Sequence, residues 1–121
     1  MQTLNEPVLA ELQSFMEKHE FMALMEAALQ KLLEQAPVLL QSLADQQWDE
    51  ARRLAHRLKG TLGSLGCDTL YAALHSLEEG LRCTPPLTPQ AQAMAELTVT
   101  LQATELALSQ HCALARSATL R

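Results

Sequence analysis

The chain has 121 residues, of which 48% are hydrophobic and only 3% aromatic, and its formal net charge is −5. This length fits one domain with a single core, so we expect residues 1–121 to form one unit. The acidic balance argues against a nucleic-acid binder. No apolar run approaches the roughly 18 residues that span a bilayer, and the N-terminus lacks the basic and apolar regions of a secretory signal.

The cysteines and the absence of targeting signals favour a cytoplasmic domain without membrane contact. Cys67, Cys83 and Cys112 are odd in number and widely spaced. Such a set is typical of reduced thiols rather than of a disulfide framework.

The hydrophobic pattern predicts helices along the whole chain. A first helix is expected to open at Asn5 and Pro7, because proline is tolerated in a first turn. A long second pattern covers residues 22–43 with spacings typical of a helix, and Pro37 within it indicates either a kink or two abutting helices. A third helix is predicted at residues 48–64, and Gly66 closes it.

Two more helices are predicted towards the C-terminus. The fourth carries a leucine every three or four residues from Leu70 to Leu81. The segment CTPPLTPQ is the clear loop, with Thr88 as N-cap and Pro89 as the first residue of the last helix. Short connections favour antiparallel neighbours, so the fold class is all-α: an antiparallel up-down four-helix bundle with an additional short N-terminal helix. We expect a monomer, because one bundle accounts for every apolar stripe.

The stretch AHRLKGTLGSLG, residues 55–66, places His56 on the polar side of the third helix. At about 100° per residue, Leu54 and Leu58 fall on the opposite, core-facing side, whereas Lys59, Gly60 and Gly63 fall within roughly 60° of His56. A buried core histidine is therefore excluded. An ordinary solvated surface histidine remains an open alternative.

The glycines favour a functional interpretation of this face. Each costs a helix interior up to about 1 kcal/mol relative to alanine, and packing against the core does not explain them. A missing Cβ instead gives another protein clearance to approach the imidazole. Lys59 places an ammonium group beside the ring, and Arg52, Arg53 and Arg57 add positive charge. A nucleophilic imidazole nitrogen with cations beside it and a cleared approach suits phosphoryl transfer.

These residues resemble the histidine-containing phosphotransfer (HPt) domain of multistep two-component phosphorelays. The similarity covers roughly residues 20–82 and rests on a spaced pattern, which is Ala55-His56, Lys59-Gly60, Gly66, Leu70 and Leu77-Glu78. The chain departs from many members at Gln47, where an acidic residue commonly precedes the position of Trp48. The loosely patterned ends favour an origin as the C-terminal module of a hybrid sensor histidine kinase.

The resemblance implies a phosphoryl carrier rather than an enzyme. His56 would accept a phosphoryl group from the aspartyl phosphate of a receiver domain and pass it to the aspartate of a response-regulator receiver. Lys59 would stabilise the group and Gly60 would leave room for the receiver, which brings Mg²⁺, so the chain needs no cofactor of its own. The other residues expected to contact the partner are Arg52, Arg53, Arg57, Gly63 and Ser64. The alternative is a non-catalytic helical adaptor that binds an acidic partner through the basic His56 face.

The other titratable residues are interpreted as structural. Glu78 and Glu79 are expected to be solvated, although Glu78 lies where the neighbouring helix could reach the His56 face. Cys67 is expected to fill a tight helix start rather than act as a redox thiol. The remaining histidines are interpreted as a helix-boundary residue (His19), a solvated side chain (His75) and a residue outside any metal site (His111), since no second Cys/His pair stands at ligand spacing.

Overall fold

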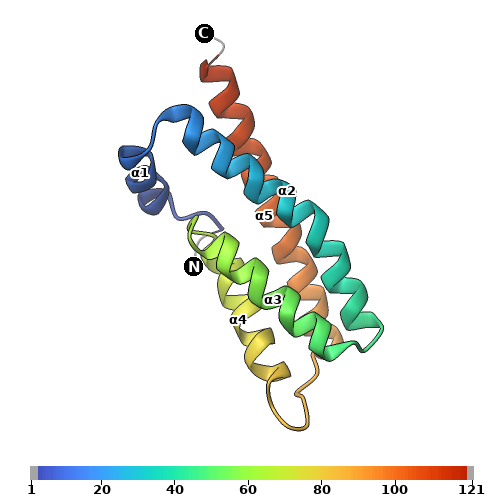
Figure 1. Cartoon of the computed structure of the whole chain (residues 1–121). Helices are drawn as coiled ribbons and strands as arrows, with labels where there is room; N and C mark the ends of the chain where they lie inside the picture. Colours follow the sequence, from blue (N-terminus) through green and yellow to red (C-terminus); the bar gives the residue numbers. More distant parts are fainter. Residues whose placement is uncertain (1–2, 120–121) are drawn as a thin grey trace.

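The computed structural model of the chain describes the backbone of residues 3–119 and the side chains of residues 3–114. This part of the chain contains five helices and no strand (Figure 1), namely α1 (Glu6–Phe15), α2 (Lys18–Ala44), α3 (Trp48–Gly63), α4 (Asp68–Leu81) and α5 (Ala91–Thr119). The all-α class and the short additional N-terminal helix are confirmed. The expected domain limits of 1–121 include four terminal residues that lie outside the described ones.

Four of the helices form a closed up-and-down ring. α3 packs against α2 and α4, and α5 packs against the same two helices, so α3 and α5 are diagonal neighbours. Short turns at residues 45–47 and 64–67 join α2 to α3 and α3 to α4, which forces these pairs to run antiparallel. The face of α3 that points away from α2 and α4 is therefore open to solvent.

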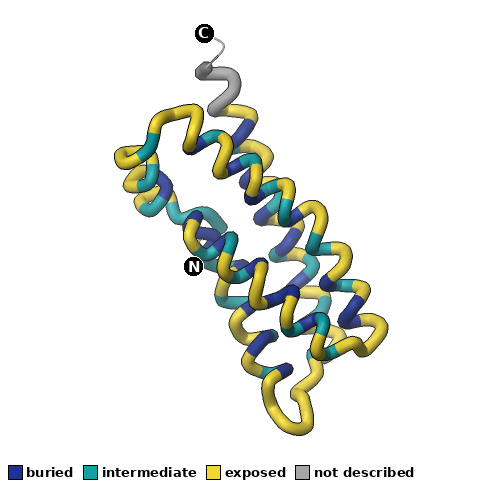
Figure 2. Tube along the Cα trace, viewed as in Figure 1, coloured by how far each residue is buried: buried dark blue, intermediate teal, exposed yellow. Residues whose placement is uncertain are grey.

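Leucine dominates the core of this ring. Figure 2 shows each helix buried along one side and exposed along the other, as an amphipathic helix requires. The predicted core residues Leu54 and Leu58 are buried, and so are Ala51 and Leu62 on the same side of α3 and Leu65 just after its end. Burying a leucine side chain stabilises the fold by about 1.5–3 kcal/mol, so this face anchors α3 and fixes its rotation about its own axis.

The two pairs of helices differ in length, and α1 packs at one end of the bundle. α2 has 27 residues and α5 has 29, whereas α3 has 16 and α4 has 14. α2 and α5 consequently extend beyond α3 and α4 (Figure 1), and α1 packs on α2 at this end with Leu9 buried in the core.

Asn5 connects α1 to the turn between α3 and α4. Its side-chain oxygen caps α1 by accepting from the Val8 N–H at 3.3 Å, and its side-chain amide donates to Asp68 at 3.0 Å. Its backbone N–H donates to the Gly66 carbonyl at 2.8 Å. Gly66 has a φ of +76° and no space for a Cβ, which would lie 2.8 Å from the Asn5 side chain. The glycine predicted to close the third helix is thus required by conformation and by contact.

Two of the predicted boundaries need comment. Pro37 lies on the exposed side of one continuous helix, α2, so the alternative of two abutting helices is wrong. α3 begins at Trp48 as predicted, and Gln47 is its N-cap but forms no side-chain capping hydrogen bond. Asp49 and Glu50 lie in the first turn of α3 instead, where negative charge complements the helix dipole.

The predicted start of the last helix is wrong. Thr88 does not cap a helix and Pro89 does not begin one, because α5 starts at Ala91. The Leu87 N–H donates to the Gly80 carbonyl at 2.9 Å, which holds the loop against the end of α4. The chain enters α5 only afterwards, where the Gln90 carbonyl accepts from the Met94 N–H. Within the described residues, none of the helices combines the length and apolarity that crossing a lipid bilayer requires.

Candidate functional site

His56 lies in the middle of α3, on the side opposite the buried leucines. Its side chain is 61% exposed, and Nδ1 lies 2.7 Å from Oε1 of Glu78 on α4. The predicted orientation of this residue away from the core is therefore confirmed. One edge of the ring is held by the neighbouring helix and the remainder faces solvent.

Glu78 is the residue that organises the site. Its side chain is completely buried, and both carboxylate oxygens have cationic or N–H partners. Besides His56 Nδ1, Oε1 accepts from Arg82 Nη2 at 2.7 Å, and Oε2 lies 2.7 Å from Lys59 Nζ. The prediction that Glu78 is solvated is wrong, because the close packing of α3 on α4 encloses the carboxylate between the two helices.

The Glu78 carboxyl is ionised in this environment. Burial by itself raises the pKa of Glu78, but hydrogen bonds from Lys59 and His56, and the charges on both, outweigh it and lower the pKa from its ordinary value. An ionised carboxylate only accepts hydrogen bonds. Nδ1 of His56 is therefore protonated and donates its N–H to Oε1 of Glu78. In the neutral ring the lone pair then belongs to Nε2, on the exposed edge of the imidazole.

Lys59 is held beside His56 by residues of α4. Its side chain is only 14% exposed, and besides the ion pair with Glu78 its Nζ donates to His75 Nδ1 at 3.3 Å. The ammonium group also lies 5.8 Å from the centre of the Tyr71 ring, and Tyr71 stacks on His75 with ring centres 6.1 Å apart. His75 is solvent-exposed as predicted, but its position at the site was not anticipated.

The two glycines of the His56 face differ in what surrounds them. A Cβ at Gly60 would have no atom within 4 Å, so this position is open space. A Cβ at Gly63 would lie 2.6 Å from Cδ2 of Tyr71. The inference that internal packing cannot explain Gly63 is therefore wrong, because the Tyr71 ring of α4 covers it. Only Gly60 has the clearance predicted for both.

A hollow of about 240 Å³ beside His56 is lined by guanidinium groups. Its lining residues are Arg52, Arg53, His56, Arg57 and Arg82. With Lys59, these arginines account for five of the nine lysine and arginine residues of the chain. Arg82 was missed in the sequence, although its spacing of four residues from Glu78 on a helix was a usable signal. Ser64 lies at the C-cap of α3, about 12 Å along the axis from His56, and does not line the hollow.

The remaining candidates have structural environments. Cys67 is buried at the start of α4, as predicted, and burial followed by the Asp68 charge raises the pKa of its thiol to about 11. It is therefore protonated at neutral pH and a poor nucleophile. His111 packs edge-on against Phe21 with ring centres 5.9 Å apart.

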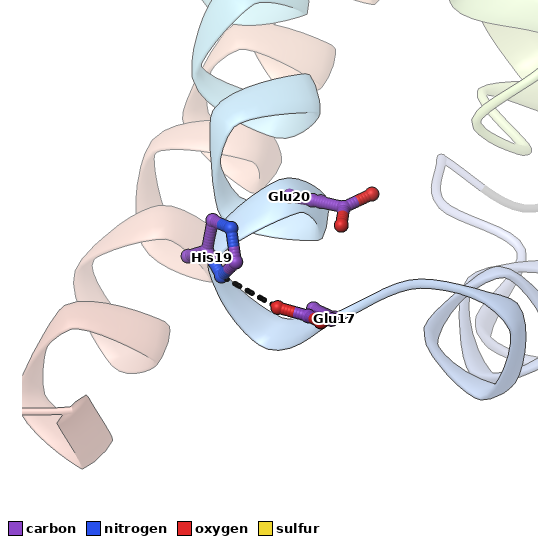
Figure 3. Close-up of side chains that lie close together, drawn as sticks. All are labelled: Glu17, His19 and Glu20. Atoms are coloured by element: carbon purple, nitrogen blue, oxygen red, sulfur yellow. Dashed lines mark ion pairs between the residues drawn. The ribbon is translucent and has the colours of Figure 1, made fainter.

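His19 lies in the first turn of α2, which agrees with its predicted place at a helix boundary. Its Nδ1 is 3.3 Å from a carboxylate oxygen of Glu17, and Glu20 lies close to both (Figure 3). All three side chains are exposed. Acidic groups at a helix start are expected from the helix dipole, so we assign no metal to them.

An up-and-down bundle that presents one exposed histidine among cations has the form of a histidine phosphotransfer module. The family model described as the Hpt domain matches residues 20–111, so the chain belongs to the Hpt domain family. Hpt domains carry phosphoryl groups in two-component phosphorelays, interact with receiver domains, and are carriers rather than catalysts. The matched range covers α3, α4, nearly all of α2 and residues 91–111 of α5, and it leaves α1 outside. Searches among curated proteins and among solved structures find no significant match.

Proposed function

We propose that this chain carries a phosphoryl group on Nε2 of His56 between the aspartates of two receiver domains. The observation that supports the proposal most directly is the hydrogen bond from Nδ1 to the buried Glu78 carboxylate. It holds the ring in place and leaves the other nitrogen as the nucleophile. This hydrogen bond argues against the alternative of an ordinary solvated surface histidine, whose ring would not be fixed by a buried carboxylate.

The transfer requires only one bond to form and one to break. The Nε2 lone pair attacks the phosphorus of a receiver aspartyl phosphate, the Nε2–P bond forms, and the P–O bond to the aspartate breaks with release of its carboxylate. The ring becomes cationic in this step, and the Glu78 carboxylate stabilises that charge through the Nδ1 proton. In the onward step a carboxylate oxygen of the second receiver attacks the phosphorus and the Nε2–P bond breaks.

Lys59 and the arginine-lined hollow supply the positive charge that phosphoryl transfer needs. Arg52 and Arg57 have no acidic partner in the part of the chain that the structure describes, so they remain available to a phosphoryl group or to an acidic receiver surface. Gly60 leaves room for the receiver to approach the ring. Gly63 and Ser64 remain candidates for the edge of the same docking surface.

We assign Mg²⁺ in this exchange to the receiver. The carboxylate nearest to His56 is Glu78, which already binds three partners and is enclosed between two helices. It is therefore poorly suited to hold a metal ion, and the chain requires no cofactor of its own. The donor in this scheme is a receiver of a hybrid sensor kinase, the acceptor is a response regulator, and the exchange takes place in the cytoplasm.

The test is phosphotransfer from purified, phosphorylated receiver domains to the native chain, followed with labelled phosphate. We expect an acid-labile, alkali-stable label on the native chain and none on His56→Gln. His19→Gln is the matched control, because it removes an exposed imidazole far from the site, and it should accept label at the native rate. Label that persists on His56→Gln, or no label from a broad panel of receivers, would refute the proposal and favour the adaptor alternative.

A further inference from the structure

The outward face of α5 is exposed over its whole described length and carries no charge. Ten described residues lie within about 60° of Leu106 on this helix and are all exposed. They are Ala91, Gln92, Ala95, Val99, Gln102, Ala103, Leu106, Ser109, Gln110 and Ala113. We refer to them as the α5 outer face. It is separate from the core face of α5, which includes Leu97, Leu101 and Leu108.

Solvation alone does not account for this composition. A helix face that only meets water is normally rich in charged residues, and 19% of this chain is charged. Here Val99 is 63% exposed and Leu106 is 59% exposed, seven residues apart on one line of the helix. The expectation that one bundle accounts for every apolar stripe therefore missed this second stripe on α5.

A hollow lies on each side of the α5 outer face, and side chains of another helix can enter both hollows. One, of about 370 Å³, lies between α4 and α5 and is lined by Leu77, Leu87 and Leu97 among others. Another, of about 380 Å³, lies between α2 and α5 and includes Leu33, Ser109 and Ala113. A ridge of side chains flanked by grooves is the shape on which a second helix packs.

We propose that the α5 outer face binds a second copy of this chain, with the two α5 helices antiparallel about a two-fold axis near Gln102 and Ala103. In that arrangement Val99 of one protomer packs against Leu106 of its partner, and the same contact repeats on the other side of the axis. The small side chain of Ala103 at the crossing point lets the two helices approach closely.

Charge favours a second copy as the occupant. Each protomer has a net charge of −5, so most ways of bringing two protomers together place like charges against each other. The α5 outer face lowers this cost because none of its own residues is ionisable, although Glu96 and Glu26 line the hollows beside it. Its glutamine and serine side chains both donate and accept hydrogen bonds, so they are complementary to themselves under two-fold symmetry.

The position of α5 makes this dimer compatible with exchange at both histidines. α5 is the diagonal neighbour of α3 in the ring, so the two His56 sites point away from the dimer axis. From Ala91 to Ala113 the face is about 33 Å long. A contact along one helix face of this length is smaller than a typical obligate interface, so we expect a dimer of micromolar rather than nanomolar affinity.

Sedimentation equilibrium of the full chain and of charge variants tests the proposal. The native chain should show a concentration-dependent dimer, and Val99→Lys and Leu106→Glu alone should each be monomeric. The double variant Val99→Lys/Leu106→Glu should recover the dimer, because antiparallel pairing sets each lysine opposite a glutamate of the other copy. Val38→Lys on α2, which is 48% exposed and outside the interface, is the matched control and should dimerise like the native chain.

Each result tests the proposed dimer independently of the proposed phosphotransfer, because sedimentation measures only the oligomeric state. A native chain that is monomeric up to about 1 mM would overturn the proposal and leave the face for a different protein or another domain. A dimer that survives both single variants would also overturn it, because the interface would lie elsewhere. Loss of the dimer without recovery in the double variant would overturn the antiparallel pairing. Circular dichroism confirms that each variant is folded.

Discussion

Glu78 shows how one buried carboxylate can serve both the stability and the chemistry of this domain. Removing an unpaired carboxylate from water costs several kcal/mol, which only well-placed partners offset. Here three partners reach it from two helices, and each of them remains in contact with solvent. The carboxylate thus joins α3 to α4 at the same point where it orients His56.

The lowered pKa of Glu78 predicts a pH-dependent stability that Glu78→Gln removes. A carboxyl whose folded pKa lies below its unfolded value of about 4.5 stabilises the fold when ionised. That contribution is fully present above pH 4.5 and is lost as the pH falls through the lower folded pKa. We expect the native chain to exceed Glu78→Gln in free energy of unfolding by about 2 kcal/mol at pH 7, and the difference to shrink below pH 4.5.

Urea unfolding monitored by circular dichroism between pH 7 and pH 3 measures this difference. Glu79→Gln is the matched control, since this exposed neighbour reaches only Arg82, at 3.7 Å, and its substitution should change stability by less than about 0.5 kcal/mol. A gap between the native chain and Glu78→Gln that stays constant over this range would show that the ionised carboxylate is not the source of the stability.

At the scale of elements, the α3–α4 pair is the working unit of the domain. One line of α4 residues, Tyr71, His75, Glu78 and Arg82, follows the spacing of four, three and four that marks a single helix face. This line packs beside the His56 face of α3 and supplies the hydrogen bonds, the ion pairs and the ring contact that the structure shows for Lys59 and His56 outside their own helix.

The sequence predicted α3 well because a single helix determines most of its features. Its start at Trp48, its core leucines and the outward direction of His56 all follow from the periodicity of one segment. The burial of Glu78 and the covering of Gly63 by Tyr71 depend instead on how α4 packs against α3. A projection of one helix contains no information on that packing. The predicted N-cap at Thr88 failed for a related reason. The hydrogen bond from Leu87 to Gly80 ties the loop to α4, and α5 begins only after it.

The contact between Gly63 and Tyr71 predicts a coupling between the two helices. Gly63→Ala should gain up to about 1 kcal/mol in helix propensity, but in the native background the new methyl group meets the Tyr71 ring and the gain is lost. In a Tyr71→Ala background the gain should reappear. The double-mutant cycle should therefore give a coupling of about 1 kcal/mol by urea unfolding.

Gly60→Ala provides the matched control for that cycle. It introduces the same methyl group on the same helix where nothing lies within 4 Å, so it should stabilise the protein equally with and without Tyr71. Equal effects of Gly63→Ala in both backgrounds would contradict the packing of Tyr71 on Gly63.

At the scale of the whole molecule, some parts of the chain contribute to stability without taking part in the proposed exchange of phosphoryl groups. The His56 site is built from α3 and α4, and α5 lies on the far side of the ring. α1 lies outside the part of the chain that matches the Hpt family, yet it contributes the buried Leu9 to the common core. We therefore interpret α1 as a cover for the end of the bundle that leaves the site itself unchanged.

This division of roles predicts that Leu9→Ala lowers stability without affecting transfer. Leu9 is 1% exposed. Truncating a leucine so deeply buried lowers the free energy of unfolding by about 2–5 kcal/mol, because the surrounding residues relax only partly and leave a cavity. The unfolding midpoint in urea should fall accordingly. At temperatures well below its melting point the variant should accept phosphate on His56 within about twofold of the native rate, since α1 packs on α2 and not on the α3–α4 pair.

Glu11→Ala, an exposed change on the same helix, serves as the control for this experiment and should alter neither stability nor transfer measurably. A Leu9→Ala chain that is fully folded but slow in transfer would mean that α1 positions the α3–α4 pair. The connection from Asn5 to the turn at Gly66 and Asp68 would then be the physical route. Asn5→Ala should in that case slow transfer as well, whereas native-rate transfer by both variants would establish that the α3–α4 pair holds its geometry without α1.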